Sequence, residues 1–93
     1  MRRRFVARGL VQGVNFRANA AEQARRLGLT GRVWNRDDGA VDCVAEGDAA
    51  TLERFREWLA RGPRMADVDQ VESIDLPGDA RYEDFRISWS AAE

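Results

Sequence analysis

A chain of 93 residues with a formal net charge of −1 is long enough for one domain with a modest core, and we expect residues 1–93 to form that single domain. Nearly balanced charge favours neither a nucleic acid nor an anionic membrane as partner, and no apolar run approaches the length of a membrane span. With one cysteine and no histidine, the chain cannot form an internal disulfide and lacks the commonest zinc ligand, so we expect no metal and no cofactor.

The first third of the chain has a strand pattern followed by a helix pattern. Alternation from Arg3 to Gly9 predicts a strand with one apolar face. Helical spacing begins at Phe16, with Asn15 available as the N-cap, and Gly28 is placed for a left-handed turn at the C-terminal end. The apolar positions are Phe5 and Ala7 in the strand and Ala20, Ala24 and Leu27 in the helix.

The rest of the chain predicts a hairpin, a second helix and two further strands. Val33 and Asn35 share one face of a strand that turns at Asp38-Gly39 into the next strand, which carries Val41, Cys43 and Ala45. Asp48 can cap a helix that carries Leu52, Phe55 and Leu59 and stops at Gly62-Pro63. Val68 to Leu76 is a strand whose imperfect alternation predicts a bulge, and Phe85, Ile87 and Trp89 alternate as a short final strand.

The element order βαββαβ predicts an α+β fold of the ferredoxin-like type. In this sandwich two helices cover one face of a four- to five-stranded antiparallel sheet. A strand-helix-strand crossover makes the first two strands parallel, so the loop after the first strand and the end of the second lie at the same edge. Asn35 is near that end, roughly 10 Å or two strand spacings from the loop, and a bound phosphate and a water could bridge that gap.

The stretch Gly9-Leu10-Val11-Gln12-Gly13-Val14-Asn15-Phe16-Arg17 has the composition of an anion-binding loop that leads into a helix. Its two glycines let the backbone turn sharply, and the first N–H groups of the helix have no internal partner. Arg17 adds a forked cation, so we expect the anion to be a phosphate. A Walker A loop is excluded because the chain contains no lysine.

This stretch, with the strand before it, resembles the first signature of the acylphosphatase family. Gly31-Arg32-Val33-Trp34-Asn35-Arg36-Asp37-Asp38-Gly39-Ala40-Val41, closing at Gly47, resembles the second signature, with Asn35 at the family's catalytic asparagine. The segment from Gly62 to Val68 also looks like the family's turn into the fourth strand. The sequence departs from the pattern at Arg32, where the family usually has an aromatic residue, and at Trp34, where a small or basic one is usual. Neither position carries the chemistry.

The residues present favour an acyl phosphate as the substrate. Cleavage of an alkyl phosphate expels a strongly basic alkoxide and normally needs a general acid or a metal. An acyl phosphate expels a carboxylate, whose conjugate acid has a pKa of about 4, so the leaving group needs no proton. Together with the resemblance, this predicts a metal-independent acylphosphatase, a hydrolase that yields a carboxylate and inorganic phosphate. Arg17 and the backbone amides of Gln12, Gly13, Val14, Asn15, Phe16 and Arg17 would hold the phosphate while Asn35 orients the water.

Other interpretations remain open at this stage. Asn35 could also start the turn before Asp37 and Asp38, which we expect to be hairpin residues rather than catalytic acids, and we expect Cys43 to be a core residue rather than a nucleophile. Arg2 to Arg4 could attract phosphorylated substrates or form a solvated edge. The initial Met-Arg-Arg-Arg lacks the apolar stretch of a signal peptide, so we expect a cytoplasmic protein, and we expect a monomer.

Two alternative functions use the same fold. One is a non-catalytic module that binds a phosphate, another ligand or RNA. RNA is disfavoured because such modules stack bases on aromatic residues of the first and third strands, where the open face here offers Val6 and Val44 among charged residues. Trp34 of the second strand is the only open-face aromatic residue in the first three strands. The other is the acylphosphatase-like segment of a hydrogenase-maturation carbamoyl transferase, whose substrate carbamoyl phosphate is also an acyl phosphate. We expect a chain of 93 residues to lack the rest of that enzyme.

Overall fold

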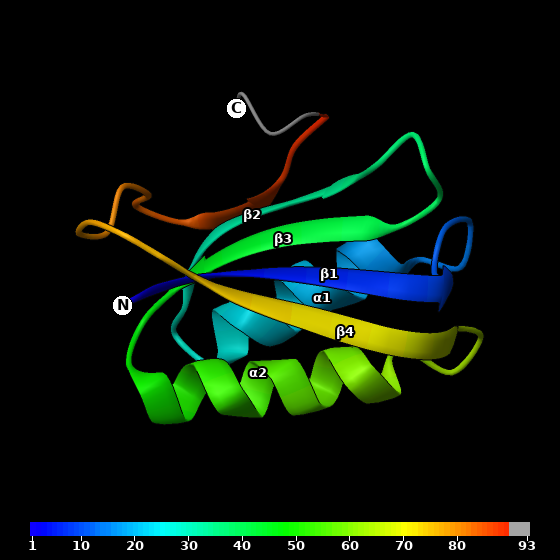
Figure 1. Cartoon of the computed structure of the whole chain (residues 1–93), viewed down its shortest axis with the longest axis horizontal. Helices are drawn as coiled ribbons and strands as arrows, with labels where there is room; N and C mark the ends of the chain where they lie inside the picture. Colours follow the sequence, from blue (N-terminus) through cyan, green and yellow to red (C-terminus); the bar gives the residue numbers. More distant parts are fainter. Residues whose placement is uncertain (90–93) are drawn as a thin grey trace.

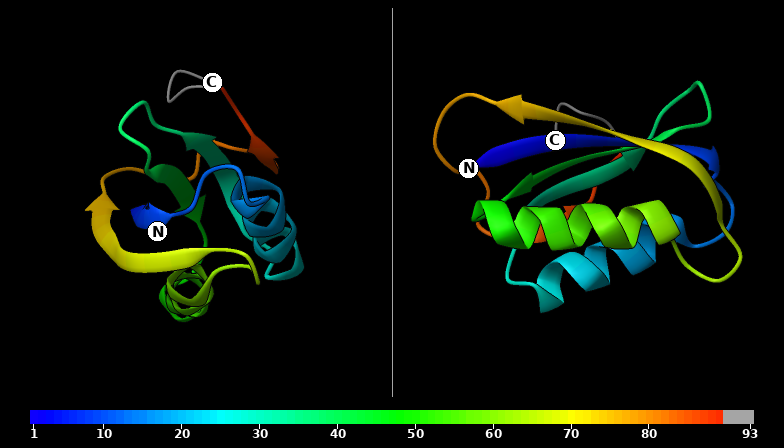
Figure 2. Two further views of the ribbon diagram at one scale, coloured as in Figure 1. Left: turned by 90° about the vertical axis from the view of Figure 1, so that its right-hand side faces the viewer. Right: turned by 60° about the horizontal axis from the view of Figure 1, so that its bottom comes forward.

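The structure of the chain is a computed structural model that describes residues 1–89. In chain order its elements are β1 (Arg2–Leu10), α1 (Phe16–Arg26), β2 (Thr30–Asn35), β3 (Val41–Glu46), α2 (Ala49–Arg61), β4 (Asp67–Leu76) and β5 (Phe85–Ile87). Within the described residues the sheet has five strands in the order β4-β1-β3-β2-β5. Both helices cover one face of it (Figures 1 and 2). The predicted ferredoxin-like arrangement is therefore confirmed.

The fifth strand makes the sheet mixed rather than wholly antiparallel. β5 pairs with β2 in parallel, with Gly31 opposite Phe85 and Val33 opposite Ile87, whereas the pairs β1·β3, β1·β4 and β2·β3 are antiparallel. The direction follows from the topology. β4 ends at the end of the sheet where β2 begins, so a segment that crosses that end and enters β5 must run parallel to β2. Our expectation of a purely antiparallel sheet missed this pairing.

Helix caps and turns lie close to where the sequence predicts them. Asp48 is the N-cap of α2, and its carboxylate accepts a hydrogen bond from the Thr51 N–H at 2.8 Å. Gly28 (φ 74°) and Gly62 (φ 71°) both have a positive φ where α1 and α2 end, and Gly62 has an extended ψ of 178°. The predicted bulge appears as a register shift in the β1·β4 pairing between Arg8 and Gly9. These local signals fix the ends of the elements and so the loops between them.

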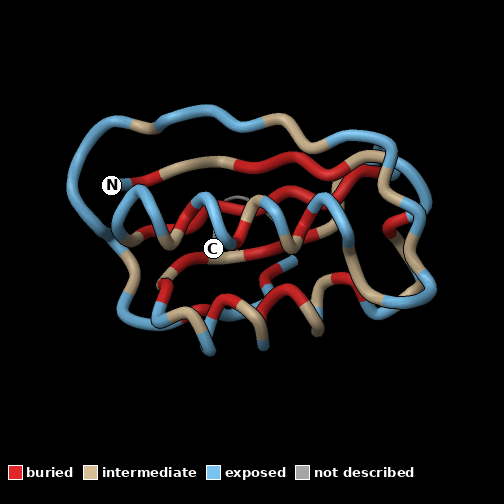
Figure 3. Tube along the Cα trace, turned by 90° about the horizontal axis from the view of Figure 1, so that it is seen from below, coloured by how far each residue is buried: buried red, intermediate tan, exposed pale blue. Residues whose placement is uncertain are grey.

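The core lies between the sheet and the helices, as the burial pattern in Figure 3 shows. Phe5 and Phe55 join β1 to α2 with ring centroids 5.8 Å apart, and Phe55 also contacts Phe85 of β5. Cys43 is part of this core and is 1% exposed. No helix in the described part of the chain is long and apolar enough to cross a membrane. The packing of both helices on one face leaves the other face of the sheet uncovered, and that face carries Val6 and Val44 among charged side chains.

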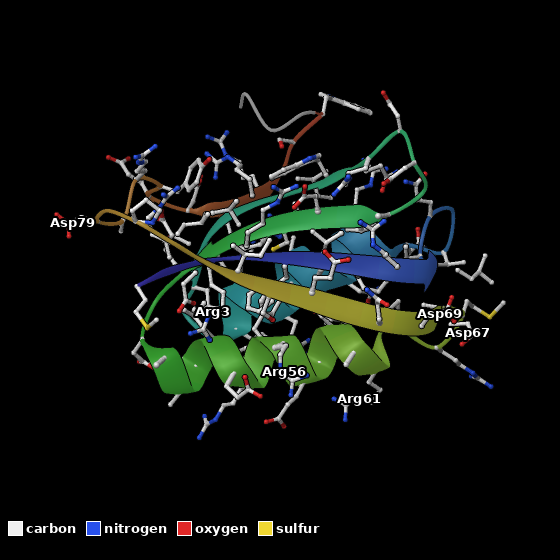
Figure 4. The ribbon with its side chains drawn as sticks, in the orientation of Figure 1. Arg3, Arg56, Arg61, Asp67, Asp69 and Asp79 are labelled. Carbon is white, nitrogen blue, oxygen red and sulfur yellow. The ribbon has the colours of Figure 1, made fainter. Side chains whose placement is uncertain are left out.

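The uncovered sheet face carries paired charges. Arg4 Nε donates to Asp42 Oδ1 at 2.9 Å, and Arg8 Nε donates to Glu72 Oε1 at 2.9 Å. Figure 4 labels Asp67 and Asp69 at the end of the sheet that carries the loop after β1, and Asp79 at the opposite end. The arginines of this face are therefore partnered by carboxylates.

Candidate anion-binding site

The loop between β1 and α1 presents a row of free backbone donors at one end of the sheet. Gly13 and Asn15 have positive φ angles of 75° and 60°, which turn the chain into the first turn of α1. Asn15 is the N-cap, but its side chain makes no capping bond; instead Asn19 donates to the Asn15 carbonyl through its backbone N–H (3.1 Å) and its Nδ2 (2.8 Å). The backbone N–H groups of residues 12–18 donate to no other described residue. Such donors, with the positive end of the helix dipole, favour an anion.

A cavity of about 220 Å³ lies in front of these donors. It brings together five of the predicted site residues, from the loop, from α1 and from the end of β2. Figure 1 shows the loop after β1 and the β2–β3 hairpin at the same end of the sheet. The lining residues are Val11, Gly13, Asn15, Phe16, Arg17, Ala18, Asn35 and Ile87. The parallel arrangement of β1 and β2 therefore places Arg17 and Asn35 in one cavity, as the topology predicts.

Arg17 supplies a cation that has no counter-ion among the described residues. It is half-buried, and no carboxylate of the described residues pairs with it, in contrast to Arg2, Arg4 and Arg8. Its guanidinium carbon lies 5.9 Å from the ring centroid of Trp89, a side chain that is 83% exposed. A guanidinium with its donors free beside the N-terminus of a helix is suited to a bidentate contact with a phosphate.

Asn35 supplies an unused acceptor among the residues that line the cavity. It is the last residue of β2, pairs with Val41 and shares the helix-covered face with Val33. Among residues 1–89, Asn35 Oδ1 is the buried side-chain polar atom without a hydrogen-bond partner. Most buried polar atoms in native proteins are hydrogen-bonded. An unpaired Oδ1 on a residue that lines a cavity therefore indicates that a ligand or a water is its partner.

Comparison with known proteins assigns the family. A family model described as acylphosphatase matches residues 3–87. The chain belongs to the acylphosphatase family. An acylphosphatase of Marinobacter nauticus is 46% identical over 80 residues, which cover 86% of this chain and 87% of that protein.

Solved structures agree with this family. The crystal structure of acylphosphatase from Bacillus subtilis has a TM-score of 0.90 at 32% identity and covers 95% of this chain and 98% of that one. A crystal structure of full-length HypF in a phosphate- and nucleotide-bound form has a TM-score of 0.85 at 26% identity; the match covers 94% of this chain but 11% of HypF. This acylphosphatase-family chain therefore matches one small part of HypF.

The other reactive side chains of this acylphosphatase-family protein lie outside the cavity. Burial raises the pKa of the Cys43 thiol well above its ordinary value, which makes the thiol a poor nucleophile. Asp38 belongs to the hairpin turn, where a hydrogen bond from the Ala40 N–H and an ion pair with Arg8 lower the pKa of its carboxyl. No group of three or more His, Cys, Asp or Glu side chains in the described part of the chain is placed to hold a metal.

The residues that line the cavity differ in part from those that the sequence predicted. Val11, Ala18 and Ile87 line the cavity, although sequence reasoning did not assign them. Ala18 follows Arg17 in the first turn of α1, and Ile87 has the same strand parity as core residue Phe85, so helix position and parity were the available signals. Of the loop residues expected to bind phosphate, Gln12 and Val14 do not line the cavity. Val14 packs against the core, and the Gln12 side chain turns toward the β2–β3 hairpin.

Proposed function

We propose that this protein is an acylphosphatase, which hydrolyses an acyl phosphate to a carboxylate and inorganic phosphate without a metal ion. The observation that carries the proposal is that Asn35, whose buried Oδ1 has no hydrogen-bond partner among the described residues, lines the same cavity as Arg17 and the N-terminus of α1. A cation with free backbone donors can hold a phosphoryl group. An acceptor in the same cavity can hold a water molecule.

The phosphate-binding half of the site consists of one side chain and a row of amides. The Arg17 guanidinium and the N–H groups of the loop residues that line the cavity, Gly13, Asn15, Phe16 and Arg17, donate to the nonbridging phosphate oxygens. Phosphoryl transfer depends chiefly on positioning and on stabilising the charge of those oxygens. Arg17 and the loop N–H groups support this role, because no acceptor among residues 1–89 pairs with them and would first have to be displaced.

Asn35 orients the attacking water in this mechanism. Its Oδ1 accepts a hydrogen bond from the water, whose oxygen attacks phosphorus in line with the bond to the acyl oxygen. The new bond joins the water oxygen to phosphorus, the bond between phosphorus and the acyl oxygen breaks with its electron pair on the carboxylate, and the water proton passes to a phosphate oxygen. The carboxylate leaves unprotonated because its conjugate acid has a pKa of about 4. No general acid is therefore required.

A small-molecule substrate fits the surface better than RNA does. On the uncovered sheet face Arg4 and Arg8 are paired with carboxylates, and Val6 and Val44 are at most 8% exposed. The described strands β1 and β3 carry no exposed aromatic residue on which a base could stack. We therefore do not favour the RNA-binding alternative.

The test of this function is phosphate release from an acyl phosphate and from an alkyl phosphate, each with and without chelator. Benzoyl phosphate should be hydrolysed and glycerol phosphate barely touched, and chelator should leave both rates unchanged. Inorganic phosphate should inhibit competitively, since the loop recognises the phosphoryl group. The absence of benzoyl phosphate hydrolysis would reject the function. Loss of activity with chelator, restored by added metal, would reject the mechanism alone.

A further inference from the structure

The side chain of Gln12 connects the anion-binding loop to the hairpin that carries Asn35. Its Nε2 donates to the carbonyl oxygens of Arg36 (2.8 Å) and Ala40 (2.9 Å), which are 24 and 28 residues away in the chain. Both hydrogens of the Gln12 amide are therefore used. No cavity wall or ligand role accounts for this side chain, because Gln12 does not line the cavity.

The two carbonyls stand on either side of the turn that joins β2 to β3. Arg36 directly follows Asn35, and Ala40 directly precedes Val41, the residue paired with Asn35. The Arg36 N–H donates to the Ala40 carbonyl at 2.8 Å, and the Gly39 N–H donates to the Arg36 carbonyl at 3.2 Å. Each carbonyl thus keeps a backbone partner if the Gln12 amide is removed. The turn does not depend on Gln12 for its own closure.

We propose that Gln12 is a positioning residue that fixes the distance between the phosphate-binding loop and Asn35. The inference rests on the proposed function, because it matters only if a phosphate on the loop must meet a water on Asn35. In-line attack requires the reacting atoms in a narrow geometry, and a displacement of about 1 Å can cost about 100-fold in rate. The loop belongs to the β1–α1 connection and the hairpin to β2 and β3, so two bonds from one amide join the two halves of the site directly.

The experiment is a double-mutant cycle between Gln12 and Asn35, read with benzoyl phosphate for turnover and inorganic phosphate for binding. Gln12→Ala should lower kcat by about tenfold or more and leave the inhibition constant of phosphate within about twofold, because the backbone amides and Arg17 remain. In the Asn35→Ala background the same change should alter kcat by less than about twofold, since no positioned water remains to lose. Gln12→Met, which keeps the length without the donors, should behave as Gln12→Ala does.

Asp48→Ala is the stability control, because it removes one hydrogen bond of comparable length at the cap of α2 and touches no site residue. It should leave kcat unchanged. Unchanged kcat in both Gln12 variants would overturn the proposal, as would losses that multiply in the double variant or a loss of phosphate affinity equal to the loss of kcat. If the wild-type protein is inactive on benzoyl phosphate, both the proposed function and the role of Gln12 are overturned. If the wild type is active and the Gln12 variants give one of the contrary results above, only the role of Gln12 is overturned.

Discussion

Replacing Asn35 with alanine should separate stability from activity. The Asn35 side chain makes no hydrogen bond to another described residue, and its buried Oδ1 lacks a partner. A buried polar atom without a protein partner costs about 1–3 kcal/mol, or somewhat less where an ordered water serves it. Truncation of a half-buried side chain gives up about 0.5–1 kcal/mol of packing. We therefore expect Asn35→Ala to be as stable as the wild type or more stable by up to about 2 kcal/mol.

Turnover should move in the opposite direction. If aiming the water has the value of other single transition-state contacts, kcat falls by about 10²–10³, equivalent to about 2.7–4 kcal/mol. Phosphate affinity should stay nearly intact, because Arg17 and the loop amides are untouched. Thermal and urea unfolding give the stability change, and a gain of 1 kcal/mol corresponds to a rise in Tm of about 4–8 °C for a domain of this size. Steady-state kinetics with inhibition by phosphate supplies the other two quantities.

Arg17 is the contrasting position in the same assay. Arg17→Ala should weaken phosphate binding as well as turnover, and Arg17→Lys should rescue little because an ammonium lacks the planar fork of donors. Arg54→Ala, at an exposed arginine of α2 outside the cavity, is the matched control and should change neither quantity. Asn35 and Arg17 do not have these separate roles if Asn35→Ala abolishes phosphate binding, if it loses more than about 1 kcal/mol of stability, or if Arg17→Ala keeps full affinity.

Three further predictions concern Cys43, Glu46 and Trp89. Cys43→Ser should keep most activity but lower Tm, because a hydroxyl enters the core; a large fall in kcat at unchanged Tm would instead indicate a covalent cysteine mechanism. Burial raises the pKa of the Glu46 carboxyl, but hydrogen bonds from the Arg81 and Tyr82 N–H groups lower it, and the net pKa is below 4.5. The ionised Glu46 carboxylate therefore stabilises the fold above about pH 4.5, and this stabilisation is lost as the pH falls through the folded pKa. Glu46→Gln should therefore lower Tm at pH 7 and reduce the fall in Tm between about pH 6 and pH 3, and an unaltered pH dependence would contradict this. If the Trp89 ring orients the Arg17 guanidinium, Trp89→Ala should weaken inhibition by phosphate by about two- to fivefold, and Trp89→Phe should keep most of the inhibition. Equal inhibition in the wild type and both variants would show that the contact has no such role.

Local signals in the sequence predicted most of the elements. Alternation placed the first strand at Arg3 to Gly9, within one residue of β1 at each end, and the Asp48 cap marked the start of α2. The parallel pairing of β5 was not predictable in this way, because its direction depends on where residues 77–84 cross the sheet rather than on any feature of Phe85–Ile87. Likewise, Asn15 has the right residue type for a side-chain cap, but its left-handed backbone conformation (φ 60°) takes the side chain out of that role.

The site was predictable as far as topology and parity reach. The crossover from β1 to β2 predicts that Arg17 and Asn35 approach one another, and both line the cavity. The contribution of Ile87 depends on the register of β5 beside β2, and the contact of Gln12 with the hairpin depends on a rotamer and on two carbonyls far along the chain. The parity of Ile87 with Phe85 indicates which face of the strand it is on, but neither contact itself has a periodic signature, because both are tertiary contacts between segments that are paired only in the folded chain.

The treatment of buried polar groups elsewhere in the protein shows why the Asn35 oxygen is informative. Glu46 is 3% exposed, yet its carboxylate accepts hydrogen bonds from Arg2 Nε, Thr30 Oγ1 and the N–H groups of Arg81 and Tyr82. Because the fold supplies four donors to the buried Glu46 carboxylate, a general shortage of donors does not explain why the Asn35 carboxamide oxygen has none. A protein keeps an unpaired buried acceptor, at some cost in stability, where a bound molecule donates a hydrogen bond to it. The free Oδ1 of Asn35 therefore supports our proposal that this residue binds the water of the reaction, as the N–H groups of the loop that no described residue accepts support phosphate binding.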